Sequence, residues 1–190
     1  WSPAALESQA VAARTFAMYQ KAHQPTGSLY DTCDTTSCQV YKGMATYSTS
    51  LTRSSYEYAS STAAVKATSG LGVFYGGVPA LTQFGSSNGG QTVSSSLVYQ
   101  VSKADPYDNV PSGSSSRWTA SLSVSRIQSA YPTTGSFKAL RIDKRDGYNT
   151  WGGRISILTI IGSSGSKTVS GDSFRSTMGL RSNWWTVTSA

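Results

Sequence analysis

The sequence has few of the residues that usually build metal sites or nucleophilic active sites. Its 190 residues contain one histidine, two cysteines and two glutamates. Zinc takes about four ligands, and His23 stands ten residues before the first cysteine with no second histidine to join it. We therefore expect no metal and no other cofactor.

Charge and long apolar runs are also scarce. Only 13% of the residues are charged, so Ser, Thr, Asn, Gln and Gly must solvate the surface, a composition typical of exported proteins. No hydrophobic run approaches the roughly 20 residues of a membrane span, and no charged-then-apolar leader is present. We expect no membrane span, and expect any signal peptide to have been removed from this chain.

We also expect residues 1–190 to form a single domain, because this length is too short for two comfortable ones.

The charge that is present is mostly positive. Sixteen Lys and Arg oppose nine Asp and Glu, a net charge of +7, which attracts anionic polymers such as nucleic acid, anionic lipid and the acidic bacterial wall. The basic residues are scattered and no nucleic-acid-binding motif is present, so we expect no nucleic-acid partner. A merely solvating excess of base remains an equal alternative.

Local signals predict an α+β fold in which an opening helix packs on a mixed, mostly antiparallel β structure with short additional helices. Helices are expected over residues 4–21 with Ser2 as N-cap, 54–68, 123–131, and 171–178 before Gly179. In the second helix, four residues are expected to face inward: Tyr58, Thr62, Ala63 and Val65. Strands are expected over residues 72–75 and 78–84 around a Gly76-Gly77 turn, 97–101, 140–143 and 154–161 around an Asp146-Gly147 turn, and 183–188. Residues 28–52 are predicted to be loop-rich, and residues 111–116 to form an exposed loop.

The two cysteines, Cys33 and Cys38, are five positions apart. In an exported chain such a pair closes a small loop as a disulfide, whereas in a reduced chain it could hold two corners of a metal site. The lack of further ligands favours the disulfide.

Three segments combine residues that could contact a ligand. In residues 5–17, Glu7 and Arg14 are two turns apart, about 10 Å along one helix face, although a solvated face over an alanine-packed core explains the same pattern. Residues 84–92 offer glycine backbone N–H groups, hydroxyls and an amide of the kind that bind sugars, with a flexible turn as the alternative. In residues 169–182, Arg175 is either a surface charge or a groove-lining donor.

Taken together, these strings resemble the SpoIID/LytB family over essentially the whole chain. The resemblance rests on the order AAL-x-x-QAVAARTFA, YD-x-C-D-T-T-x-C-QVY-x-G, A-V-x-A-T-x-G, F-x-SS-x-GG-x-T and SG-x-x-FR-x-x-x-GLRS. It implies an exported protein of the bacterial cell wall. Enzymes of this family are lytic transglycosylases that cleave the MurNAc–GlcNAc bond of denuded peptidoglycan to 1,6-anhydro ends, and other members enhance a partner amidase.

The family's general acid is a glutamate in an E-M-P motif shortly before the position of Trp1, and this motif is not in the chain. We therefore expect a SpoIID-like domain over residues 1–190 that lacks its extreme N-terminal part, with that segment and an amidase as possible partners beside the glycan strands. Glu7 is the substitute acid candidate, and Arg14 matches the family's motif arginine. The residues expected to bind the glycan are Gln9, Gln39, Tyr41, Ser86, Ser87, Asn88, Gly89, Gly90, Thr92 and Arg175.

Ser37 stands where some relatives carry a histidine that binds zinc with the cysteines, so the resemblance also favours the disulfide. Two alternatives to an enzyme remain: a non-catalytic, peptidoglycan-binding amidase enhancer, and a generic basic wall-binder whose retention on wall would fall in high salt.

Overall fold

The computed structural model describes residues 1–108 and 117–188. The chain divides into two compact units, Trp1–Gly85 and Ser86–Ala190, and each is described by itself. The expected single domain stays a prediction. The loop expected over residues 111–116 lies outside the described residues.

The first unit is built on the opening helix, α1 (Pro3–Ala22). Ser2 caps it as predicted, because its hydroxyl accepts a hydrogen bond from the Ala5 amide at 3.3 Å. The helix contacts α2 (Ala59–Ala67) and strand β4 (Val78–Pro79), which pairs with β3 (Phe74–Tyr75). Gly76 and Gly77 have φ of 59° and 82°, so the predicted glycine turn is confirmed, although its strands are shorter than expected.

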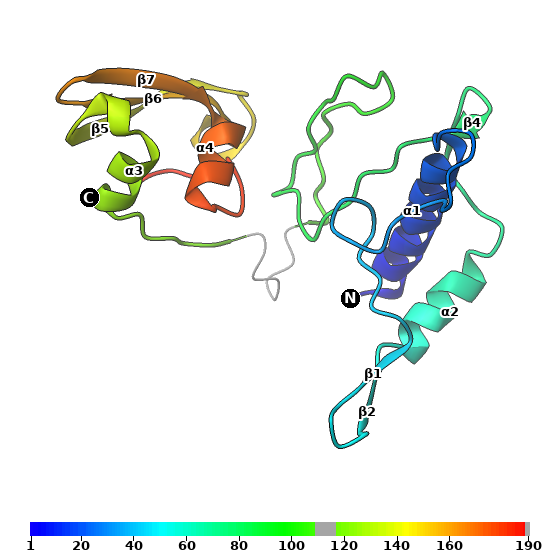
Figure 1. The fold of residues 1–190 in the computed structure, drawn as a ribbon. Coiled ribbons are helices and arrows are strands. Elements are labelled where there is room, and N and C mark those ends of the chain that lie inside the picture. Colours follow the sequence, from blue (N-terminus) through cyan, green and yellow to red (C-terminus); the bar gives the residue numbers. More distant parts are fainter. Residues whose placement is uncertain (109–116, 189–190) are drawn as a thin grey trace. The chain divides into compact units, whose positions relative to one another are not determined.

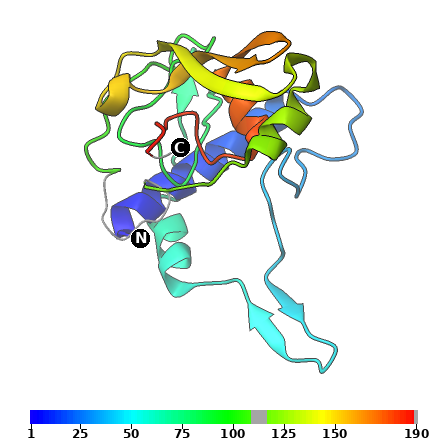
Figure 2. The same cartoon turned by 90° about the vertical axis from the view of Figure 1, so that its left-hand side faces the viewer.

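The predicted start of the second helix is wrong. Residues 53–55 form strand β2 (Arg53–Ser55), which pairs with β1 (Ala45–Tyr47) inside the segment expected to be loop-rich. Serine favours caps and turns over helix interiors, and the ladder with β1 satisfies this backbone instead. The residues predicted to face inward, Tyr58, Thr62, Ala63 and Val65, are exposed, and the buried position of α2 is Ala64. Figures 1 and 2 show the β1–β2 hairpin projecting away from α1 and α2.

The second unit contains an antiparallel sheet in the order β5 (Phe137–Arg145), β6 (Ile155–Gly162) and β7 (Gly165–Ser170). Helices α3 (Val124–Ala130) and α4 (Gly171–Met178) lie on one side of it (Figures 1 and 2). The core of this unit is formed by apolar side chains of α3, α4 and β6 and of the segments that follow the two helices. Its buried residues are Ile127, Tyr131, Ile155, Leu158, Ile160, Phe174, Met178 and Leu180. A Cβ on Gly171 would lie 1.8 Å from the Ile155 carbonyl oxygen, so glycine lets α4 begin directly against β6.

Both helices of this unit confirm the prediction, and Gly179 ends α4 in the left-handed conformation. The strands expected at 140–143 and 154–161 are confirmed within β5 and β6, while β7 was not predicted. The strands expected at 97–101 and 183–188 are wrong. The first segment closes on itself, because the Gln100 amide donates to the Leu97 carbonyl at 2.9 Å.

The tail meets β6 through one backbone bond, from the Ile155 amide to the Asn183 carbonyl at 2.9 Å, and forms no ladder. Helices and antiparallel sheets in both units confirm the α+β class. In the part of the chain that the structure describes, we find no helix with the length and apolar character needed to span a bilayer.

Candidate functional site

Helix α1 anchors other segments of the first unit, because side chains from these segments donate hydrogen bonds to its backbone carbonyls. The Thr82 hydroxyl donates to the Ala12 carbonyl and the Gln39 amide to the Ala13 carbonyl, both at 2.8 Å. A helical carbonyl keeps a second lone pair for such a donor, and alanine leaves room for the donor to approach. The run of alanines thus serves to anchor two flanking segments.

Thr15 extends this anchoring inside the unit. Its side chain is buried, donates to the Val11 carbonyl at 2.7 Å and accepts from the Val73 amide at 3.0 Å. The segment that leads into β3 is therefore fixed to α1.

Arg14 binds the C-terminal end of α2. Its guanidinium donates to the Thr68 carbonyl at 2.8 Å and to the Leu71 carbonyl at 2.9 Å, with longer bonds to the Val65 carbonyl and the Thr68 hydroxyl. The last carbonyls of a helix have no partner within it, and a cation there also meets the negative end of the helix dipole. Arg14 is consequently a positioning residue that holds α2 against α1.

An open pocket of about 400 Å³ lies in this region, and we call it the α1–α2 pocket. Its lining consists of Glu7, Ser8, Val11, Ala12, Thr68 and Val73. Glu7 is partly exposed in the wall, and Arg14 acts on the same pocket by holding Thr68. Of the two residues predicted to share one helix face, Glu7 lines this pocket and Arg14 holds another lining residue, Thr68, in place.

A second open pocket, of about 470 Å³, lies beside the cysteines, and we call it the disulfide pocket. Its lining consists of Gln9, Ala13, Thr36, Cys38, Gln39, Val40 and Phe84. It brings together Gln9 and Gln39, which were both predicted to bind glycan, whereas Tyr41 is exposed outside the lining. At 100° per helical residue, Gln9 and Ala13 face a different side of α1 from the α1–α2 pocket.

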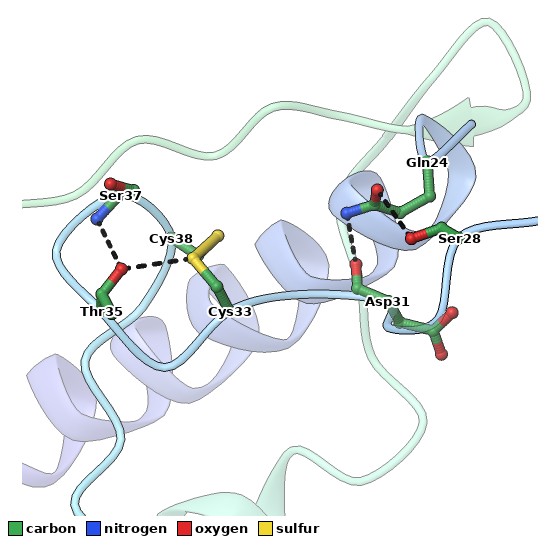
Figure 3. Close-up of a disulfide and its surroundings, with 7 residues drawn as sticks. All are labelled: Gln24, Ser28, Asp31, Cys33, Thr35, Ser37 and Cys38. Atoms are coloured by element: carbon green, nitrogen blue, oxygen red, sulfur yellow. Dashed lines mark hydrogen bonds between the residues drawn. A yellow bond between two sulfur atoms is a disulfide. The ribbon is translucent and has the colours of Figure 1, made fainter.

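The predicted disulfide is present. Cys33 and Cys38 are bonded, with their Cα atoms 5.3 Å apart. Within the loop, the Thr35 hydroxyl lies 3.4 Å from the Cys33 sulfur and accepts from the Ser37 amide (Figure 3). The bond therefore closes the short loop that carries Gln39 into the disulfide pocket.

A match to a known family covers the same segment as these features. Residues 1–75 match the family model SpoIID, described as stage II sporulation protein. This match supports SpoIID family membership. It spans α1, α2 and the disulfide, and it implies a sporulation-related function at the cell wall. No curated protein matches the chain.

The second unit contains the glycine-serine loop predicted to bind sugars. The carboxylate of Asp108 accepts from the Ser87 hydroxyl at 2.7 Å, the Gly89 amide at 2.6 Å and the Gly90 amide at 3.1 Å. The Asn88 side chain donates to Asp105 at 2.8 Å. The donors expected for a ligand are thus bonded to two aspartates that sequence reasoning missed, because no local spacing connects residues about 20 positions apart.

Two other predicted contacts in the second unit, Thr92 and Arg175, also have partners. Thr92 Oγ1 donates to the Val101 carbonyl at 3.0 Å and accepts from the Lys103 amide at 2.7 Å. Arg175 is partly exposed on α4 and pairs with Asp172 at 3.6 Å. Ser86 is exposed.

Arg154 was not predicted, and it fastens the glycine-serine loop to β6. Its guanidinium donates to the carbonyls of Asn88 and Gln91 and stacks on the ring of Trp184, 4.9 Å from the centroid. Burial lowers the pKa of Arg154, while the nearby Asp146 carboxylate opposes this shift. Arg154 therefore has a structural role, and one arginine before an apolar strand gave no signal of this role in the sequence.

Proposed function

We propose that this chain is a peptidoglycan-acting domain of a lytic transglycosylase, which cleaves the MurNAc–GlcNAc bond of denuded glycan strands and leaves 1,6-anhydro ends. The observation that carries the proposal is the overlap of the family match with the α1–α2 pocket, whose lining residues all lie within residues 1–75. The net charge of +7 adds attraction for an acidic wall polymer.

The chemistry of this reaction suits a pocket with one carboxylic acid. The acid protonates the glycosidic oxygen, the bond from that oxygen to C1 breaks, and the C6 hydroxyl of the same sugar attacks C1 and returns a proton to the carboxylate. Because this nucleophile is intramolecular, no second carboxylate is required to activate water. In the two pockets described for residues 1–85, Glu7 is the one carboxylate among the lining residues.

Two glutamates are therefore candidates for the acid. One is Glu7 itself, in the second turn of α1. The other is the glutamate of the family's E-M-P motif, which is expected near the N-terminal end of α1 and is not within the 190 residues. In either case we expect Arg14 to shape the pocket through Thr68 and not to contact the sugar.

The experiment compares this chain with the same chain carrying an E-M-P segment before Trp1, each incubated with denuded glycan and analysed by mass spectrometry. Release of anhydro-ended fragments by either form is the expected result. If Glu7 is the acid, Glu7→Gln removes the activity of the 190-residue chain. Glu57→Gln is the matched control, because Glu57 is an exposed glutamate of the same unit that pairs with Arg53 at 3.8 Å. Intact glycan after prolonged incubation with both forms would refute the proposal.

A specific observation favours a second candidate function, that of a non-catalytic amidase enhancer. The segment from residue 29 to 58, which includes the projecting β1–β2 hairpin, exposes an unusual set of large apolar and aromatic side chains: Leu29, Tyr30, Val40, Tyr41, Met44, Tyr47, Leu51, Tyr56 and Tyr58. Exposed apolar side chains concentrated on one segment are a candidate contact surface for a partner protein.

For this second candidate, amidase turnover on purified wall is measured with and without the protein. Stimulation that survives Glu7→Ala and is lost in Tyr47→Ala would establish the enhancer function. Equal turnover with and without the protein would exclude it.

A further inference from the structure

The loop between β5 and β6, residues 146–153, has an unusual backbone. Asn149 and Trp151 have φ of 50° and 58°, and in the described residues Leu51 is the other residue besides glycine with positive φ. Such a conformation is energetically unfavourable for residues other than glycine, and it persists only where the surrounding structure enforces it. A tryptophan held there points to a function for its side chain.

The surroundings do enforce this conformation. Asp146 Oδ1 accepts from the Tyr148 amide at 3.3 Å and from the Arg154 amide at 2.9 Å, and the Gly147 amide donates to the Gly152 carbonyl at 2.9 Å. A Cβ on Gly153 would lie 1.8 Å from the same Asp146 oxygen. The base of the loop is therefore tightly closed.

Two side chains from outside the loop hold it as well. The Trp184 indole donates to the Thr150 carbonyl at 3.0 Å. The Arg145 guanidinium donates to the Gly153 carbonyl at 2.7 Å. Because Trp184 lies far along the chain, the tertiary fold of the second unit maintains the strained shape.

In the loop held by these bonds, two aromatic side chains are exposed to solvent. Tyr148 is 43% exposed and Trp151 is 55% exposed, and neither belongs to the core. The residues between them, Asn149 and Thr150, are exposed and uncharged. The charged groups at the base of the loop, Asp146 among them, are engaged in bonds to the loop backbone and to Arg154.

We propose that this loop is a glycan-contact site in which Trp151, assisted by Tyr148, stacks on an N-acetylhexosamine ring; the inference rests on the proposed wall-glycan function. A hexosamine has a face of C–H bonds that packs on the negative π face of an aromatic ring. Its rim of hydroxyl and amide groups matches the exposed side chains of Asn149 and Thr150. The tip carries no charged side chain, so it fits a neutral sugar face and not an anion. The loop also lies outside the residues matched by the family model, so it is an observation independent of that match.

The test is titration of the whole chain with a β-1,4-linked N-acetylglucosamine tetramer, followed by calorimetry and by the NMR signals of the tryptophan indole N–H groups. Trp151→Asn is the sharpest variant, because asparagine tolerates positive φ and replaces the indole ring by a short amide with no stacking face. We expect about tenfold weaker binding in Trp151→Asn and nearly full binding in Trp151→Phe, as for a central aromatic contact. The indole signal that disappears in Trp151→Asn should be the one that the tetramer shifts most.

Tyr107→Ala is the matched control, because Tyr107 is an 86% exposed aromatic residue of the same unit. Equal losses in Tyr107→Ala and Trp151→Asn, unchanged affinity in a folded Trp151→Asn, or no binding by the unaltered chain would each overturn the inference. Tetramer binding that depends on Trp151 in a protein that releases no anhydro products would support this site while refuting the transglycosylase proposal. Cleavage that persists in Trp151→Asn with unchanged tetramer affinity would refute this site while supporting the transglycosylase proposal.

Discussion

Replacing Arg14 with alanine should detach α2 from α1. The guanidinium makes two short bonds, at 2.8 Å to the Thr68 carbonyl and at 2.9 Å to the Leu71 carbonyl, and two longer ones. A hydrogen bond from a charged donor contributes about 1.5–3 kcal/mol. The Leu71 contact is exposed, and water would replace part of what is lost there. Counting the two short bonds at the lower value and neglecting the longer ones, we expect Arg14→Ala to lower the free energy of unfolding by about 3 kcal/mol.

The assay combines urea unfolding, followed by circular dichroism, with hydrogen exchange of the α2 amides. Exchange is needed because the chain has two compact units, which need not unfold together. Arg14→Lys should recover only part of the loss, since an ammonium lacks the planar fork of the guanidinium. Arg53→Ala is the control: its exposed pair with Glu57, at 3.8 Å, should contribute less than about 1 kcal/mol. A cost for Arg14→Ala no greater than that of the control, or unchanged exchange in α2, would refute the role assigned to Arg14.

Two further predictions concern the disulfide and one carboxylate. Replacing Cys33 and Cys38 by serine should lower the free energy of unfolding by about 2 kcal/mol, the loop-closure entropy of so short a loop; an unchanged urea midpoint would contradict this. The hydrogen bond from Thr159, and after it that from Arg141, holds the pKa of Asp143 below its ordinary value. Asp143 therefore stabilises the fold above its unfolded pKa of about 3.9, and this contribution disappears as the pH falls through the folded pKa. Asp143→Asn should accordingly flatten the fall in urea midpoint between pH 6 and pH 3, and a slope identical to that of the unaltered chain would count against the argument.

Elements with strong local signals were predictable from the sequence. Ser2, Ser123 and Ser170 each cap a helix through a hydroxyl that accepts a backbone amide, and Gly179 ends α4 with positive φ. These interactions span three or four residues, so they are legible in the sequence alone. The wrong strand at 183–188 depended on distant partners, because only one backbone bond joins that segment to β6.

The candidate site shows the same division between local and distant information. The helical spacing of Glu7 and Arg14 correctly indicated one region of α1, but the four bonds of Arg14 go to residues 51 to 57 positions away. The pairing of Gln9 with Gln39 in the disulfide pocket likewise depends on the fold. The rings of Tyr148 and Trp151 left no sequence signal, since an aromatic residue in a strand-rich region is more often part of a core.

Two of the predicted ligand-binding features are used inside the protein, and this limits which groups remain for the proposed glycan contact. The backbone N–H groups of Gly89 and Gly90 both donate to the side-chain carboxylate of Asp108. A carboxylate accepts hydrogen bonds about twice as strong as those of a neutral oxygen, so a sugar hydroxyl entering the loop would exchange strong bonds for weak ones. We therefore expect any glycan contact in residues 86–92 to run through the exposed Ser86 hydroxyl, while the amides remain with Asp108. By the same reasoning, we expect the proposed glycan contacts to depend on exposed side chains, with Glu7 in the α1–α2 pocket and the ring of Trp151 contributing more than the glycine-serine loop.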